Sequence, residues 1–150
     1  MNIEMREISA DNFVDAIHLE VRPEQSRFVA SNAASIAQSK FHTFLNCCGL
    51  FAGDTMVGFC AFGEHPENGT VWIVRYMIGA AYQGKGYGKK GLAVLLRHLW
   101  QKYACSAIFL DVAPENEAAV RFYEGAGFRD TGDIQGHSRI YRLDLPSAGV

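Results

Sequence analysis

The fold of this chain is decided by the segment Val71-Trp-Ile-Val-Arg-Tyr-Met-Ile-Gly-Ala-Ala-Tyr-Gln-Gly-Lys-Gly-Tyr-Gly-Lys-Lys90. It begins as an apolar, strand-like run that ends at Ile78. A glycine-rich turn over residues 83–88 follows and leads into a helical pattern. Glycines let the backbone approach a ligand closely, and the free N–H groups at the start of a helix bind anions. The segment therefore predicts a phosphate site of the kind that holds a nucleotide-like cofactor.

Two general phosphate-binding patterns compete for these glycines. Gly79-x-x-x-x-Gly84-Lys85 follows the P-loop up to the lysine, but Gly86 replaces the Ser or Thr that would hold magnesium. Gly86-x-Gly88-x-x-Gly91 has the spacing of the dinucleotide-binding fingerprint, and Asp111 follows about 20 residues later. In that fold the glycines follow the strand directly, whereas residues 79–85 separate them from it here.

The size and composition predict a single domain that covers residues 1–150. The chain is 49% hydrophobic and 20% charged, which is enough apolar material for one core. No apolar run reaches the roughly 18 residues of a membrane helix, and the N-terminus lacks the apolar core of a signal peptide. The four cysteines lack metal-binding spacing. We therefore expect a cytoplasmic protein with reduced thiols, no membrane segment and no metal site.

The charge of the chain is divided unevenly between its two halves. The net charge is −2, made up of −5 over residues 1–69 and +3 over residues 70–150. A basic half suits a phosphorylated cofactor, and an acidic half suits a cationic co-substrate. No basic stripe with interleaved aromatic residues is present, so nucleic acid is not an expected partner.

Hydrophobic periodicity predicts the order strand, helices, three antiparallel strands, helix, strand, helix and two strands. The predicted elements are a strand over 3–8, a helix capped by Asp11, a short helix from Pro23, a helix over 33–41 capped by Ser31 or Asn32, strands over 50–52, 56–62 and 71–78, a helix over 86–103, a strand over 107–112, a helix from 114 to Gly125 or Gly127, and strands over 128–135 and 138–143.

Two motifs in the second half of the chain resemble those of the GNAT superfamily of N-acetyltransferases. Gln83-Gly-Lys-Gly-Tyr-Gly88 is similar to the pyrophosphate loop of that superfamily. Asn116-x-x-Ala-x-x-Phe-Tyr123-x-x-x-Gly-Phe128 is similar to its second signature. The resemblance implies an α/β (α+β) fold with a mixed, mostly antiparallel sheet, a splayed parallel strand pair and flanking helices. It also implies acetyl-CoA as the co-substrate.

The first half of the chain narrows the resemblance. Residues 21–32 and 72–78 are similar to small bacterial spermine/spermidine (diamine) acetyltransferases. This implies transfer of an acetyl group to a primary amine of a small cationic acceptor, by direct attack in a ternary complex. Such relatives are often homodimers. The alternatives are a protein, peptide or other small amine as acceptor, or a non-catalytic protein that senses CoA.

The resemblance also assigns roles to single residues. Tyr123 is expected to protonate the departing CoA thiolate. Asn116 is expected to bind the cofactor and also has the position of a helix N-cap. The other expected cofactor-binding residues, besides Tyr123 itself, are Tyr76, Met77, Ile78, Gln83, Gly84, Lys85, Gly86, Tyr87, Gly88 and Lys89.

The residues that handle the acceptor are harder to assign. Glu64 is the nearest candidate for the base that takes a proton from the amine. Glu20, Glu24 and Arg75 are candidate acceptor-binding residues. Val74 stands where some relatives carry a carboxylate on the central strand, so the sequence lacks the expected acid there.

Overall fold

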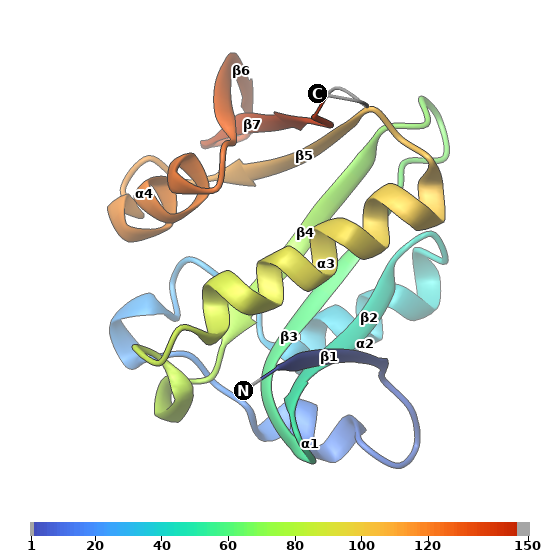
Figure 1. The fold of residues 1–150 in the computed structure, drawn as a ribbon, viewed down its shortest axis with the longest axis vertical. Coiled ribbons are helices and arrows are strands. Elements are labelled where there is room, and N and C mark those ends of the chain that lie inside the picture. Colours follow the sequence, from blue (N-terminus) through green and yellow to red (C-terminus); the bar gives the residue numbers. More distant parts are fainter. Residues whose placement is uncertain (1, 147–150) are drawn as a thin grey trace.

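The structure, a computed structural model, describes residues 2–146, which form one seven-stranded sheet flanked by helices (Figure 1). The strand order is β1-β2-β3-β4-β5-β7-β6, and all neighbouring strands are antiparallel except β4 and β5. This confirms the predicted mixed, mostly antiparallel sheet. The strands are Ile3–Glu7 (β1), Asn46–Ala52 (β2), Thr55–Glu64 (β3), Val71–Ile78 (β4), Ala107–Val112 (β5), Arg129–Gln135 (β6) and Ser138–Asp144 (β7).

The helices cover both faces of the sheet. They are Phe13–His18 (α1), Asn32–Phe41 (α2), Tyr87–Tyr103 (α3) and Glu117–Gly125 (α4), with single 3₁₀ turns at Pro23–Gln25 (η1) and Ala80–Tyr82 (η2). In Figure 1, α3 crosses one face of β1–β4, and α1 and α2 lie on the other face. The central strand β3 is therefore buried on both faces, which explains its continuous apolar run.

The antiparallel pairing of β3 with β4 excludes the doubly wound fold that the dinucleotide fingerprint would require. Helix α3 instead packs on the sheet through one apolar stripe, in which Leu92, Leu95 and Leu99 are buried at helical spacing. Its glycine-rich start is thereby held next to the end of β4.

Strand β4 contains a β-bulge at Val74. Ala61 of β3 pairs with Arg75, whereas the next residue, Phe62, pairs with Ile73, so Val74 is the extra residue. Before the bulge Ile73 packs in the core under α3, and after it Tyr76 does so. A bulge re-aims the side chains that follow it, and no pattern in the sequence indicated this one.

Strands β4 and β5 separate soon after they meet. They pair only at Val71 with Ile108 and at Trp72 with Phe109, although β4 continues to Ile78 and β5 to Val112. Strand β7 pairs along the whole length of β5 and holds it in place. The parallel pair is thus splayed, as the resemblance implied.

Most differences from the predicted elements concern their ends. Strand β2 begins at Asn46 rather than at residue 50, because residues 46–49, which carry no large apolar side chain, also pair with β3. Helix α1 follows Asn12 and has no side-chain cap, so Asp11 is not its cap. Ser31 caps α2 by accepting a hydrogen bond from the Ala34 N–H.

Over residues 2–146, no helix has the length and apolar character to cross a membrane, and no group of three or more side chains is placed to hold a metal.

Candidate active site

The splay between β4 and β5 opens two adjoining cavities. The β4–β5 cavity has a volume of about 480 Å³ and is lined by the two strands, the start of α4 and residues 27–30. The loop cavity, of about 290 Å³, is lined by the end of β4, the glycine turn and α4. The walls of both include Phe28, Val29, Tyr76, Asn116, Ala119 and Tyr123. The cavities therefore meet at the open end of the splay.

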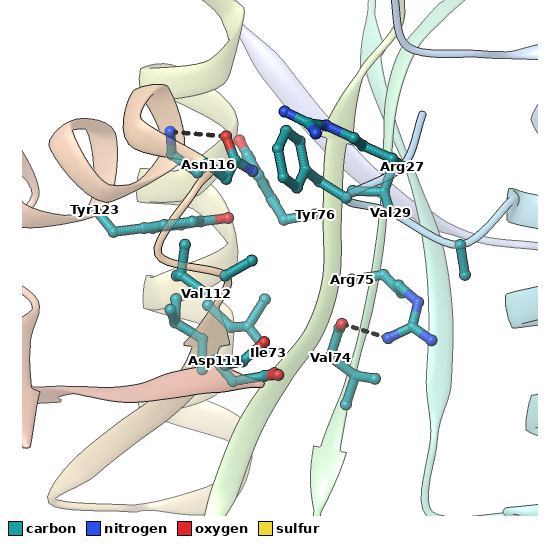
Figure 2. Close-up of a pocket in the computed structure, with 16 residues that line it drawn as sticks. Arg27, Val29, Ile73, Val74, Arg75, Tyr76, Asp111, Val112, Asn116 and Tyr123 are labelled. Carbon is teal, nitrogen blue, oxygen red and sulfur yellow. Dashed lines mark hydrogen bonds between the residues drawn. The ribbon is translucent and has the colours of Figure 1, made fainter. Parts of the chain in front are cut away.

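Tyr123 stands at this junction. It projects from α4 and packs edge-on against Phe122 and Phe128, with ring centroids 5.1 and 5.7 Å away. Figure 2 shows its hydroxyl directed toward Tyr76, and that hydroxyl has no hydrogen-bond partner within residues 2–146. Burial raises the pKa of the Tyr123 phenol above its ordinary range. The hydroxyl is thus a protonated donor, free to serve a ligand.

Tyr76 ties the end of β4 to the start of α3. Its ring stacks on Phe122, and its hydroxyl donates a hydrogen bond to the Gly88 carbonyl. A Cβ atom on Gly91 would lie 2.7 Å from the Tyr76 hydroxyl, so glycine is needed there for α3 to come this close. Burial, reinforced by the neighbouring Tyr123, raises the pKa of Tyr76. Tyr76 therefore acts as a neutral brace of the junction.

Asn116 is the N-cap of α4, as its position predicted. Its Oδ1 accepts a hydrogen bond from the Ala119 N–H at 3.3 Å, which Figure 2 shows as a dashed line. Because the cap uses only Oδ1, the Nδ2 amide remains available to donate. Asn116 lines both cavities, so the same side chain can cap the helix and contact a ligand.

The glycine turn has the geometry of an anion site. Gly84 and Gly86 have φ values of +77° and +84°, which residues other than glycine rarely adopt. A Cβ atom at either position would meet open space, so conformation rather than crowding requires these glycines. The first hydrogen bond of α3 runs from the Lys90 N–H to the Gly86 carbonyl, which leaves the N–H groups of residues 87–89 without a helical acceptor. These donors, the helix dipole and the nearby exposed lysines suit a pyrophosphate.

Gln83 holds the turn in place. Its amide donates to the Ile78 carbonyl at 2.9 Å, at the end of β4. It also exchanges hydrogen bonds with the amide of Gln25 in η1, at 2.9 and 3.3 Å. The sequence suggested that Gln83 braces the loop, and the structure adds Gln25 as its partner. The segment that contains η1 is thereby fastened over the loop cavity.

Three charged side chains line the β4–β5 cavity: Arg27, Arg75 and Asp111. Figure 2 shows the Asp111 carboxylate directed from β5 toward β4. The sequence analysis noted Asp111 only through the dinucleotide fingerprint and gave it no role at this site. Its signal was a single acid inside the apolar strand at residues 107–112. Asp111 is thus the carboxylate among the described residues that line this cavity.

The structure does not bring the other predicted acids to Tyr123. Glu64 is the last residue of β3 and pairs with Val71, the first residue of β4, at the closed end of the splay. In this antiparallel register Tyr76 pairs with Cys60 instead, nearer the open end. Glu20 lines a separate cavity of about 380 Å³ between α1, η1 and α2, together with Met77. Glu24 lines none of these three cavities. This geometry therefore argues against Glu64 as the base.

Comparisons with known proteins agree with this architecture. A spermine/spermidine N(1)-acetyltransferase of Bacillus subtilis is 33% identical over 140 residues, which cover 89% of this chain and 92% of that protein. The PaiA N-acetyltransferase of Thermoplasma acidophilum, solved with coenzyme A, superposes with a TM-score of 0.71 at 19% identity and covers 97% of this chain and 100% of its own. The spermidine N-acetyltransferase of Vibrio cholerae, solved with CoA and spermine, has a TM-score of 0.73 at 17% identity, with coverage of 96% and 95%.

The family assignment follows from the sequence match and is consistent with the splayed strands and the glycine turn. Residues 4–128, most of the chain, match the acetyltransferase (GNAT) family. Members of this family use acetyl-CoA as their co-substrate, and the turn before α3 fits its pyrophosphate. The chain therefore belongs to the GNAT family and is an acetyl-CoA-dependent N-acetyltransferase.

Proposed function

We propose that this enzyme transfers the acetyl group directly to a primary amine of a small-molecule acceptor while both substrates are bound. The observation that carries this proposal is the meeting of the two cavities at Tyr76, Asn116 and Tyr123. The loop cavity suits the cofactor, because it contains the glycine turn. The β4–β5 cavity is left for the acceptor, whose amine reaches the acetyl group at the junction.

The cofactor is held mainly by backbone groups. The N–H groups of the glycine turn and of the first turn of α3 bind the pyrophosphate, with Lys85 and Lys89 adding positive charge. The edge of β4 over Tyr76, Met77 and Ile78 has no β5 partner, so its backbone groups, apart from the Ile78 carbonyl that Gln83 holds, are available to the pantetheine arm. The Met77 side chain packs in the core on the other face of the sheet, so its backbone is the part proposed to bind the cofactor.

The chemistry needs a neutral amine for the attack and a proton for the departing sulfur. Acetyl-CoA supplies the acetyl group as a thioester. An alkylammonium with a pKa of about 10.4 must lose a proton, which costs about 4.6 kcal/mol at pH 7. Asp111 takes this proton and passes it to solvent, and the amine nitrogen then bonds to the acetyl carbon as the carbon–sulfur bond breaks. Tyr123 donates its proton to the sulfur and regains one from the nitrogen as the amide forms.

Replacing Gly86 with valine is expected to weaken cofactor binding. Valine is strained at a φ of +84°, so the turn leaves the left-handed region and its N–H groups no longer converge. The dissociation constant of CoA, measured by calorimetry, should rise about 5- to 100-fold. Gly132→Val is the matched control, because Gly132 has a φ of +88° with open space around it and lies on β6. Equal affinities of the two variants for CoA would contradict the assignment of the turn.

Polyamines are the first acceptors to test. The sequence predicted them, and the B. subtilis relative is named for spermine and spermidine. The carboxylates of Asp111 and Glu20 in neighbouring cavities offer partners for ammonium groups. The test is release of free CoA thiol from acetyl-CoA in the presence of spermine, spermidine, putrescine, amino acids, aminoglycosides or peptide amines. Turnover with small amines supports the proposal, and turnover confined to peptide amines would contradict it.

A further inference from the structure

The charges of the β4–β5 cavity do not match an acceptor that carries only positive charge. Two guanidinium groups, of Arg27 and Arg75, line the cavity against the single carboxylate of Asp111. Figure 2 shows Asp111 and Tyr123 on one side of β4 and the Arg75 guanidinium on the other. The cavity therefore carries the positive charge of Arg75 beyond β4, on the side away from Asp111 (Figure 2).

Arg75 has hydrogen-bonding capacity that the protein does not use. Its Nη1 donates to the Val74 carbonyl at 2.8 Å, but its Nε is buried and has no partner. No carboxylate within residues 2–146 forms an ion pair with it. A buried charged donor without an acceptor is unfavourable, and a guanidinium fork matches carboxylate or phosphate oxygens. Nε itself is closed off from solvent, so a ligand in the cavity would meet the guanidinium through its other nitrogens.

Arg27 adds a second, more exposed positive charge. Its guanidinium lies over the Phe28 ring, 4.5 Å from the centroid, and forms no ion pair within the described range. Its field reaches Glu115, whose carboxylate is already hydrogen-bonded to His137. Arg27 can therefore contribute charge to the cavity without being neutralised by a direct partner.

We propose that Arg75 forms an anion subsite, and that the acceptor is a small amine that also carries a carboxylate or phosphate group. The proposal rests on the proposed function, because Tyr123 and Asp111 define the amine end. A polyamine, such as the spermine and spermidine named for the B. subtilis relative, would instead place an ammonium group beside the Arg75 guanidinium, where the two repel. We therefore expect polyamines to be poorer acceptors here than amines that carry an anion, although the relative's name puts them first in the panel. The cavity thus selects an amine with opposite charges at its two ends.

Matched acceptors test this preference in the wild-type enzyme. Lysine differs from cadaverine, and ornithine from putrescine, by a single carboxylate; O-phosphoethanolamine differs from ethanolamine by a phosphate. We expect kcat/KM to be about 10- to 100-fold higher for the anionic member of a pair, because a hydrogen bond to a charged group contributes a free energy that corresponds to this ratio. The first two pairs report a carboxylate and the third a phosphate. Equal or higher kcat/KM for the members without an anion would overturn the inference.

Variants of Arg75 identify the residue responsible. Arg75→Gln should raise KM for the preferred anionic acceptor about 10- to 100-fold, leave KM for acetyl-CoA unchanged, and not raise KM for the counterpart that lacks the anion. Arg75→Lys keeps the charge without the planar fork, so its KM for the anionic acceptor should lie between the values of the wild type and of Arg75→Gln. Arg97→Gln, on the exposed side of α3, is the control arginine. A loss shared equally by both members of a pair would mean a structural role and would reject the subsite.

Calorimetry separates this inference from the proposed function. Lysine, cadaverine, O-phosphoethanolamine and ethanolamine are titrated into the protein saturated with CoA. Binding of an anionic amine that depends on Arg75, without turnover of any amine, would reject the proposed function and retain the subsite. Absence of preferential binding of lysine and O-phosphoethanolamine would reject the subsite, whatever amines are acetylated.

Discussion

Tyr123→Phe is expected to lower kcat by about 10²- to 10⁴-fold, the range for loss of a positioned general acid. The departing sulfur would then leave as an unprotonated thiolate. The change removes only the hydroxyl, so the ring contacts with Phe122 and Phe128 should remain. Affinity for CoA should therefore be nearly unchanged. Thiol release measures kcat, and calorimetry measures the affinity.

The matched control for this prediction is Tyr103→Phe. Tyr103 ends α3 and its hydroxyl is hydrogen-bonded to Asn46, away from both cavities. If kcat of Tyr123→Phe stayed within a few-fold of wild type, the proposal that the Tyr123 phenol acts as the general acid would be wrong. The pH profile gives a second readout. Because burial raises the pKa of Tyr123, the phenol stays protonated through pH 9, and its ionisation should cause no loss of activity up to that pH.

Asp111→Asn is expected to lower kcat/KM for the acceptor by about 10²-fold or more at pH 7, as loss of a general base does. An asparagine cannot take the ammonium proton, so the reaction depends on amine that is already neutral in solution. That population grows tenfold per pH unit below the amine pKa of about 10.4. The variant should therefore recover activity as the pH is raised toward 9, and steady-state thiol release over that range measures the recovery.

Two further substitutions sharpen this prediction. Asp133→Asn, on the exposed strand β6, is the control for loss of one negative charge. Glu64→Gln tests the base that the sequence suggested and that the strand register places away from Tyr123. If Glu64→Gln lost activity while Asp111→Asn did not, the base would be Glu64 and the assignment of Asp111 would be wrong.

Features that depend on residues close in the chain were predictable from the sequence. The glycine turn requires backbone conformations that glycine favours, and α3 follows from the spacing of Leu92, Leu95 and Leu99. Asn116 caps α4 through a contact only three residues away. Together with the two family motifs, these local signals were enough for the fold class, the family and the co-substrate, all of which are confirmed.

The wall of the β4–β5 cavity, the proposed acceptor site, depends instead on residues that are distant in the chain. Strand pairing sets which residues meet: the β3–β4 register carries Glu64 to the closed end of the splay, and the bulge at Val74 re-aims the residues after it. The splay brings Asp111 from β5 to the same cavity as Arg27 and Arg75. Periodicity reports which face of an element is apolar, but not which partner lies across from it. The sequence by itself therefore determined the glycine turn, the family and the co-substrate, because these depend on residues close in the chain, and the tertiary structure alone decided which charges line the β4–β5 cavity.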